Sequence, residues 1–210
     1  MGSCCGEDKD FDGASIEYRR ALWWVIGINA VMFFIEMGAS FHATSQALQA
    51  DALDFLGDTA TYTLSLLVIG RSLTIRNRAA LFKAVSLLLM GIAVFSMTVY
   101  RVLVLQPPEA VTMGTVGVLA LTANVISVLI LLRFRNGDAN VRSVWLCSRN
   151  DAIGNVAVIL AAAGVWQSQS AWPDLIVAAI MASLFIWSAV QILRQVQHSD
   201  SNINGSGHTS

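Results

Sequence analysis

Charged residues are scarce in this chain: they make up 13% of its 210 residues, and acidic and basic side chains nearly balance at a net charge of −1. Soluble domains carry about 25% charged residues, so the composition argues against a water-facing surface around one large core. The near-neutral balance excludes the basic footprint of a nucleic-acid-binding protein. Three cysteines do not make a disulfide framework. The composition is therefore not that of a soluble or disulfide-stabilised domain.

Long apolar runs dominate instead, because 55% of the residues are hydrophobic and runs of about twenty recur, each long enough to cross a bilayer. The sequence predicts an all-α integral membrane protein with six transmembrane helices and no soluble domain. The helices are expected at about Tyr18–Phe41, Ser45–Gly70, Ala79–Val102, Val111–Leu132, Val141–Trp166 and Pro173–Val196. Residues 18–196 would then form one transmembrane domain. The polar segments 1–17 and 197–210 are expected to be disordered tails.

The basic residues predict the orientation of the chain. Six helices place both termini on one side of the membrane, and almost all Lys and Arg residues at helix ends fall on that side: Lys9, Arg19, Arg20, Arg71, Arg76, Arg78, Lys83, Arg133, Arg135, Arg142 and Arg194. Only Arg101 falls on the other side. Cytoplasmic connections carry the excess of Lys and Arg, so both termini are predicted to be cytoplasmic. The compact, arginine-rich chain is typical of bacteria, and we expect the bacterial cytoplasmic (inner) membrane.

Three carboxylates interrupt the second apolar run. Asp51, Asp54 and Asp58 are spaced by three and then four residues, so on an α-helix they share one face. A charge near the centre of a bilayer costs at least roughly 2.5–3.5 kcal/mol. Carboxylates on one stripe also repel each other unless protons or a cation neutralise them. The stretch therefore predicts a bound cation.

A second group of polar residues lies in the fifth predicted helix. Cys147, Asp151 and Asn155 follow one another at intervals of four residues and share one face. The second and fifth helices run in opposite directions, and the depths of Asp54 and Asp58 match those of Cys147 and Asp151 near the middle of the membrane. Two such pairs on facing helices give four ligands in tetrahedral geometry. Three oxygens and one sulfur suit Zn²⁺ or a softer ion such as Cd²⁺.

The two motifs resemble those of the cation diffusion facilitator family of divalent-metal/proton antiporters. The second helix reads A-D-A-L-D-F-L-G-D over Ala50–Asp58, similar to the family's A-D-A-x-(H/D)-x-x-x-D, and the fifth reads C-S-R-N-D-A-I-G-N-V from Cys147, similar to its H-x-x-x-D with a following G-(S/N)-V. The resemblance covers about Arg19 to Gln195. Further positions that match the family are Asn29, Glu36, Asn124, the N-V-R segment before the fifth helix, and Asp174.

The resemblance implies a six-helix cation efflux domain whose transport site is Asp54, Asp58, Cys147 and Asp151. Cys147 stands where the family usually has His, which bears on the choice of metal. The family's usual cytoplasmic C-terminal domain is missing from this sequence, so we expect a form without it. The resemblance also implies a homodimer that carries zinc, with cadmium or cobalt as alternatives, and no permanently bound cofactor.

Four further residues are weaker candidates for metal binding. Asp51 lies nearer the outer end of its helix, where it would bind the ion directly, support the site, line its entrance or serve as a capping hydrogen bonder. Asn155 would replace Cys147 in the shell if that cysteine is only a small buried hydrophobe. Cys4 and Cys5 would capture a soft metal from the mobile N-terminal tail, or have little consequence there.

The predicted activity is export of a divalent metal from the cytoplasm, driven by inward proton movement. Ligands bind metal in their deprotonated form, so metal and protons compete for the same site. Three alternatives stay open: an uncoupled channel or carrier, a metal sensor or accessory protein without transport, and a proton-coupled carrier for small organic cations. An enzyme is not expected, because the sequence shows no nucleophile–base pair, phosphate-binding loop or HExxH motif.

Overall fold

The computed structural model describes residues 15–68, 73–104, 106–134 and 139–206. The all-α prediction is confirmed, since these ranges contain helices and no strand. The elements are α1 (Ile16–Ala43), α2 (Gln46–Val68), α3 (Leu73–Val104), α4 (Ala110–Leu131), the short 3₁₀ helix η1 (Leu132–Phe134), α5 (Ala139–Ser168) and α6 (Trp172–Ser206).

Local signals set the ends of the first two helices. α1 begins behind Ser15, whose side chain accepts a hydrogen bond from the backbone N–H of Tyr18 at 3.1 Å, as an N-cap residue does. It ends at Thr44, which takes a left-handed backbone conformation with φ 55° and turns the chain toward α2. The Ser45 hydroxyl then accepts a hydrogen bond from the Leu48 N–H at 3.0 Å. Both helices lie within about two residues of their predicted bounds.

The sixth helix is longer than predicted. We expected it to end near Val196, but α6 continues to Ser206. Extending an existing helix adds one hydrogen bond per residue without the cost of a new nucleus, and no proline interrupts residues 197–206. The prediction of a disordered tail is therefore wrong for residues 197–206. Residues 207–210 and the first fourteen residues lie outside the described ranges.

Four of the described helices, α1, α3, α4 and α6, contain a segment long and apolar enough to cross a membrane. Their outward faces carry large apolar side chains such as those of Phe34, Leu103 and Leu129. α2 is less apolar because it holds three carboxylates, and α5 carries the Arg149–Asp151 segment. Spanning of the membrane by α2 and α5 thus stays a prediction.

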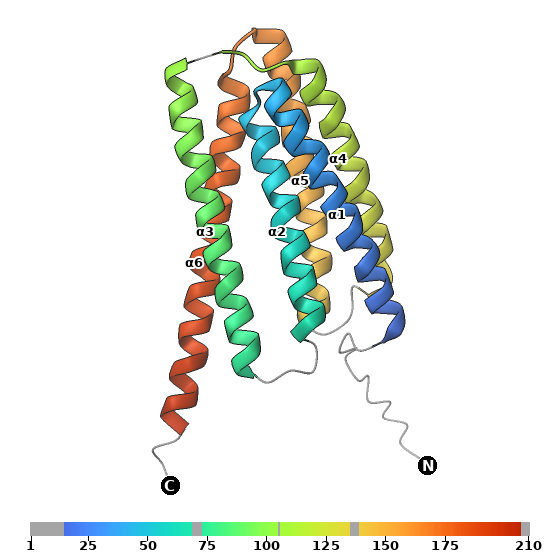
Figure 1. Ribbon diagram of the computed structural model, residues 1–210, viewed down its shortest axis with the longest axis vertical. Coiled ribbons are helices and arrows are strands. Elements are labelled where there is room, and N and C mark those ends of the chain that lie inside the picture. The colour runs from blue at the N-terminus through green and yellow to red at the C-terminus, as the bar shows by residue number, and fades with distance from the viewer. Residues whose placement is uncertain (1–14, 69–72, 105, 135–138, 207–210) are drawn as a thin grey trace, which may run out of the picture.

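The helices form an elongated bundle with roughly parallel axes (Figure 1). The start of α1 and the end of α6 lie at one end, here called the terminal end, whereas α1 leads into α2 and α5 into α6 at the opposite, far end. α3 packs on α6, α4 on α5, and α1 on both α2 and α4. α2 contacts α1, α3, α5 and α6. The helix with most of the carboxylates is therefore the central one.

Glycines allow the closest approaches between helices. A Cβ atom at Gly91 of α3 would lie 2.7 Å from Ile186 Cγ1 and 3.1 Å from the carbonyl oxygen of Ala182, both on α6. A Cβ atom at Gly117 of α4 would lie 3.1 Å from Ile159 Cγ1 on α5. Small residues at such contacts let helix backbones pack tightly in a membrane. The α3–α6 and α4–α5 pairs therefore depend on these two positions.

Candidate metal site

Three of the four predicted ligands come together where α2 meets α5. Asp54 and Asp58 lie one turn apart on α2, and both side chains are partly buried. The carboxyl of Asp151 on α5 lies close to both. The structure therefore joins the two polar faces into one cluster of acidic groups inside the bundle.

Metal binding by this cluster stays a prediction. Among the described side chains, no group of three or more His, Cys, Asp or Glu residues is arranged to hold a metal ion. Cys147 lies in α5 one turn before Asp151, but its side chain is outside the described part of the chain. Of the four side chains in the shell predicted from the sequence, the described residues thus include the three carboxyls.

Toward the terminal end, the acidic cluster is closed by Tyr62 and Ser148. Tyr62 is fully buried, its hydroxyl lies within hydrogen-bonding reach of Asp58, and its oxygen is 3.2 Å from Ser148 Oγ on α5. The pair is a second polar link between α2 and α5. The sequence analysis did not single out either residue, although Tyr62 follows Asp58 by four positions and so shares its helix face.

Toward the far end, Asp51 pairs with Asn155. Asn155 Nδ2 donates hydrogen bonds to Asp51 Oδ1 at 2.9 Å and to Oδ2 at 3.1 Å, and both residues are buried. Asn155 Oδ1 in turn accepts a hydrogen bond from Asn124 Nδ2 at 3.4 Å. These bonds connect α2, α5 and α4. They favour the alternative in which Asp51 and Asn155 support the site, because their polar atoms are already engaged with each other.

Two buried polar residues of α1, Glu36 and Asn29, extend the polar interior beyond α2 and α5. Glu36 is fully buried and its carboxyl faces that of Asp51. Asn29, two turns earlier, is also buried. Among the described residues, neither Glu36 oxygen nor Asn29 Oδ1 has a hydrogen-bond partner of good geometry. The polar interior therefore extends from α5 through α2 to α1.

Lys83 of α3 lines a cavity that lies between α2 and α3. Lys83 lies in the membrane-length segment Ala80–Leu103 and is partly buried. The cavity has a volume of about 230 Å³, and Thr61 of α2 lines it opposite the lysine. The sequence analysis grouped Lys83 with the basic residues at helix ends, whereas the structure places it in the wall of this cavity.

At the far end, Asp174 of α6 caps the beginning of α2. One carboxylate oxygen accepts hydrogen bonds from Ser45 Oγ at 2.6 Å and from the Ala47 N–H at 3.0 Å, and the other accepts from the Gln46 N–H at 2.8 Å. Asp174 and Ser45 are both buried. The first N–H groups of a helix lack partners within the helix, so a carboxylate from α6 satisfies those of α2.

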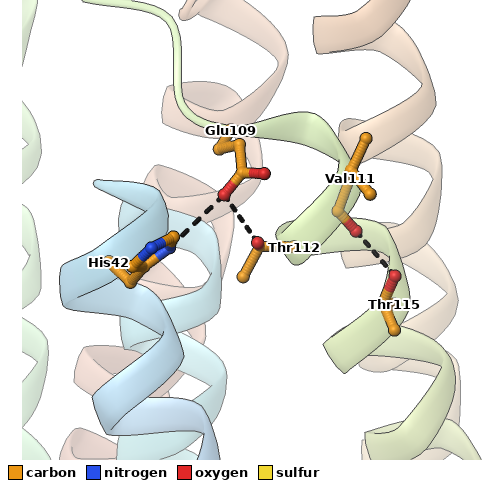
Figure 2. A network of polar contacts seen from close by, with 5 residues as sticks. All are labelled: His42, Glu109, Val111, Thr112 and Thr115. Atoms are coloured by element: carbon orange, nitrogen blue, oxygen red, sulfur yellow. Dashed lines mark hydrogen bonds and ion pairs between the residues drawn. The ribbon is translucent and has the colours of Figure 1, made fainter.

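A smaller polar network joins the end of α1 to the start of α4 (Figure 2). His42 Nδ1 lies 3.3 Å from Glu109 Oε2, which also accepts a hydrogen bond from Thr112 Oγ1 at 2.6 Å. The Glu109 N–H donates to the Ala43 carbonyl at 2.9 Å. The His42 and Glu109 side chains are 75% and 50% exposed, so the network fastens a surface connection. Cys4 and Cys5, the remaining candidates, lie outside the described residues.

Comparison with known proteins identifies the family. The sequence profile of the cation efflux transmembrane domain matches residues 22–197, a range that includes most of all six α-helices. The chain belongs to the cation efflux, or cation diffusion facilitator, family. Members of the cation efflux family are transporters rather than enzymes.

Two curated relatives illustrate the match to the cation efflux family. The zinc transporter ZitB of Escherichia coli is 28% identical over 188 residues, which are 83% of this chain and 60% of ZitB. The metal cation efflux system protein CzcD of Cupriavidus metallidurans is 27% identical over 190 residues, 84% of this chain and 58% of CzcD. The chain thus spans about three fifths of the length of these relatives.

Proposed function

We propose that this cation efflux protein exports a divalent heavy-metal ion from the cytoplasm in exchange for protons. Zinc is the foremost cargo, with cadmium or cobalt as further ones. The ion binds between α2 and α5 at Asp54, Asp58, Cys147 and Asp151. The observation that carries the proposal is the convergence of three carboxyls from two helices in a bundle whose other helices are apolar. The names of ZitB and CzcD support a metal cation as cargo.

The closeness of the carboxyls within the acidic cluster supports the exchange of metal for protons. Neighbouring carboxylates repel one another when all are ionised, so protons on some of the oxygens of Asp54, Asp58 and Asp151 would relieve this repulsion while no metal is bound. A metal ion needs the same oxygens deprotonated. Each ion that binds must therefore release protons, and returning protons expel the ion.

The setting of the site is part of the proposal. All six helices cross the bacterial cytoplasmic membrane, with both termini in the cytoplasm, and the protein works as a homodimer. The arrangement of α1 and α6, which start and end at the same end of the bundle, supports this topology. The excess of Lys and Arg at that end supports its cytoplasmic orientation.

Transport by purified protein in phospholipid vesicles tests the proposal. Vesicles with an acidic lumen are given external Zn²⁺, and uptake is followed with a trapped fluorescent indicator. The wild type should take up Zn²⁺ faster with the pH gradient than without it. Asp54→Asn should lose this uptake because a site carboxylate is removed. Glu109→Gln is the matched control, since it removes a carboxylate from the exposed far-end network and should transport normally.

The outcomes separate the proposed exchanger from its alternatives. Uptake that ignores the pH gradient would point to an uncoupled carrier. Zinc binding without any flux in the wild type would point to a sensor or accessory role. Equal loss of uptake in Asp54→Asn and Glu109→Gln would mean that the α2 cluster is not the specific site.

A further inference from the structure

Lys83 has no acidic residue beside it on its own helix or in the wall of its cavity. α3 contains no Asp or Glu, and none lines the cavity between α2 and α3. Among the described side chains, no ion pair or hydrogen bond joins Lys83 to a carboxylate. An ionisable side chain within a membrane-length segment is costly and is normally paired with an opposite charge. An anion from outside the protein would therefore stabilise this partly buried lysine.

The wall of the cavity changes from polar to apolar along the bundle. α2 and α3 run in opposite directions and meet at Gly57 and Leu87, where a Cβ atom on the glycine would lie 3.8 Å from Leu87 Cδ2. Thr61 and Lys83 line the cavity one turn from this level toward the terminal end, and Met90 lines it about one turn toward the far end. A phospholipid has the same order, with a polar headgroup above an apolar chain.

We propose that the cavity between α2 and α3 binds an anionic phospholipid of the surrounding bilayer. The lipid phosphate pairs with the Lys83 ammonium group, and part of one acyl chain lies against Leu56, Leu87 and Met90. The cavity volume of about 230 Å³ is several times the volume of about 30 Å³ that one water molecule occupies in the liquid, so it has room for a segment of chain.

The cavity opens toward the bilayer. Phe82 in its wall is 59% exposed, and the neighbouring apolar side chains of Leu81 and Val85 are exposed as well. A free phosphate ion would satisfy the lysine but leave the apolar wall uncovered, whereas a membrane lipid satisfies both. The terminal end is cytoplasmic in the proposed orientation, and the cytoplasmic leaflet carries anionic lipids. The binding test below does not depend on that orientation.

Native mass spectrometry of the full-length protein, released from detergent micelles, measures binding at this site. The protein is mixed with equal amounts of phosphatidylglycerol and phosphatidylcholine that have the same acyl chains. The wild type should bind phosphatidylglycerol about fivefold more tightly, which is the factor that one lysine near a membrane surface contributes. Lys83→Gln should abolish this preference, and Lys83→Arg should keep it. Arg78→Gln is the matched control, because it makes the same charge change at an exposed position of α3 outside the cavity wall.

The cavity itself is tested by filling it. Ala60→Met places a larger side chain in the apolar wall and should weaken the binding of both lipids. Thermal unfolding in detergent checks that the variant is folded, and Leu64→Phe, in the same wall, takes its place if it is not. Unchanged lipid binding in a folded, filled variant would overturn the proposal.

Three other results would also overturn it. Equal binding of the two lipids by the wild type would show that Lys83 does not recognise an anionic headgroup. Equal loss of preference in Arg78→Gln and Lys83→Gln would indicate attraction by general surface charge. Displacement of phosphatidylglycerol by excess inorganic phosphate would assign the lysine to a free anion. Zinc transport is not measured here, so failure of the lipid site would leave the proposed metal exchange untouched.

Discussion

Removal of the Asp174 carboxylate should destabilise the bundle more than removal of any exposed charge. The side chain is 1% exposed and accepts three hydrogen bonds, two of them from the first N–H groups of α2. Replacement by Ala leaves these buried donors without their acceptor. Replacement by Asn keeps one carbonyl oxygen but loses the charge and turns an NH₂ group toward other donors.

The magnitude follows from the number of bonds. A hydrogen bond to a charged group contributes about 1.5–3 kcal/mol, and bonds that share one carboxylate are not additive. We therefore expect Asp174→Ala to lower the free energy of unfolding by about 3–5 kcal/mol and Asp174→Asn by about 2–3 kcal/mol. In a chain of this size each kcal/mol shifts Tm by about 2–4 °C, so Asp174→Asn should lower Tm by about 5–10 °C.

The assay is thermal unfolding of the purified protein in detergent, followed by tryptophan fluorescence and by circular dichroism. Glu109→Gln is the control, because it removes a carboxylate at the same end of the bundle from a side chain that is 50% exposed. Its Tm should change by less than about 2 °C. A Tm for Asp174→Ala that stays as close to wild type as the control would show that α2 does not depend on this cap.

Three further predictions concern other contacts. Asn155→Ala leaves buried Asp51 without two hydrogen bonds and should cost about 1–3 kcal/mol in denaturant unfolding; an unaltered midpoint would contradict the pairing. Gly91→Ala forces α3 away from Ile186 and should cost about 1–3 kcal/mol, partly recovered by adding Ile186→Ala; no recovery would point to another cause. Cys147→His should raise the ratio of zinc to cadmium transport in vesicles, because imidazole is a harder ligand than thiolate, and an unchanged ratio would remove Cys147 from the site.

The helices could be predicted from the sequence because the apolar runs are about twenty residues long, which is enough to cross a bilayer as a helix. The shared face of Asp54 and Asp58 also followed from their spacing alone. The spacing did not predict which of the α5 residues would lie beside which residue of α2, because Cys147, Asp151 and Asn155 all lie on one face of α5. The packing of the two helices decides this: Asp151 lies beside Asp54 and Asp58, and Asn155 lies beside Asp51.

Contacts between distant segments were beyond sequence patterns. The sequence showed Asp174 only as a position that matches the family, whereas in the structure its hydrogen bonds go to Ser45 and to the start of α2. Lys83 was grouped with the basic residues at helix ends because it follows several of them in the sequence. The structure shows that it lines a cavity with residues of α2. The extension of α6 to Ser206 was missed because polar composition was taken as a sign of disorder, whereas an anchored helix continues through such residues at little cost.

The cap that α6 places on α2 holds the far ends of these two helices together, so a change in the angle between them would separate mainly their other ends. α2 has 23 residues and is about 35 Å long, so a tilt of α6 by about 10° against it would move their opposite ends apart by about 6 Å while the capped end barely moves. Small changes in angle are thus converted into large displacements only at the terminal end. The displaced ends belong to the half of the bundle that contains the cavity between α2 and α3.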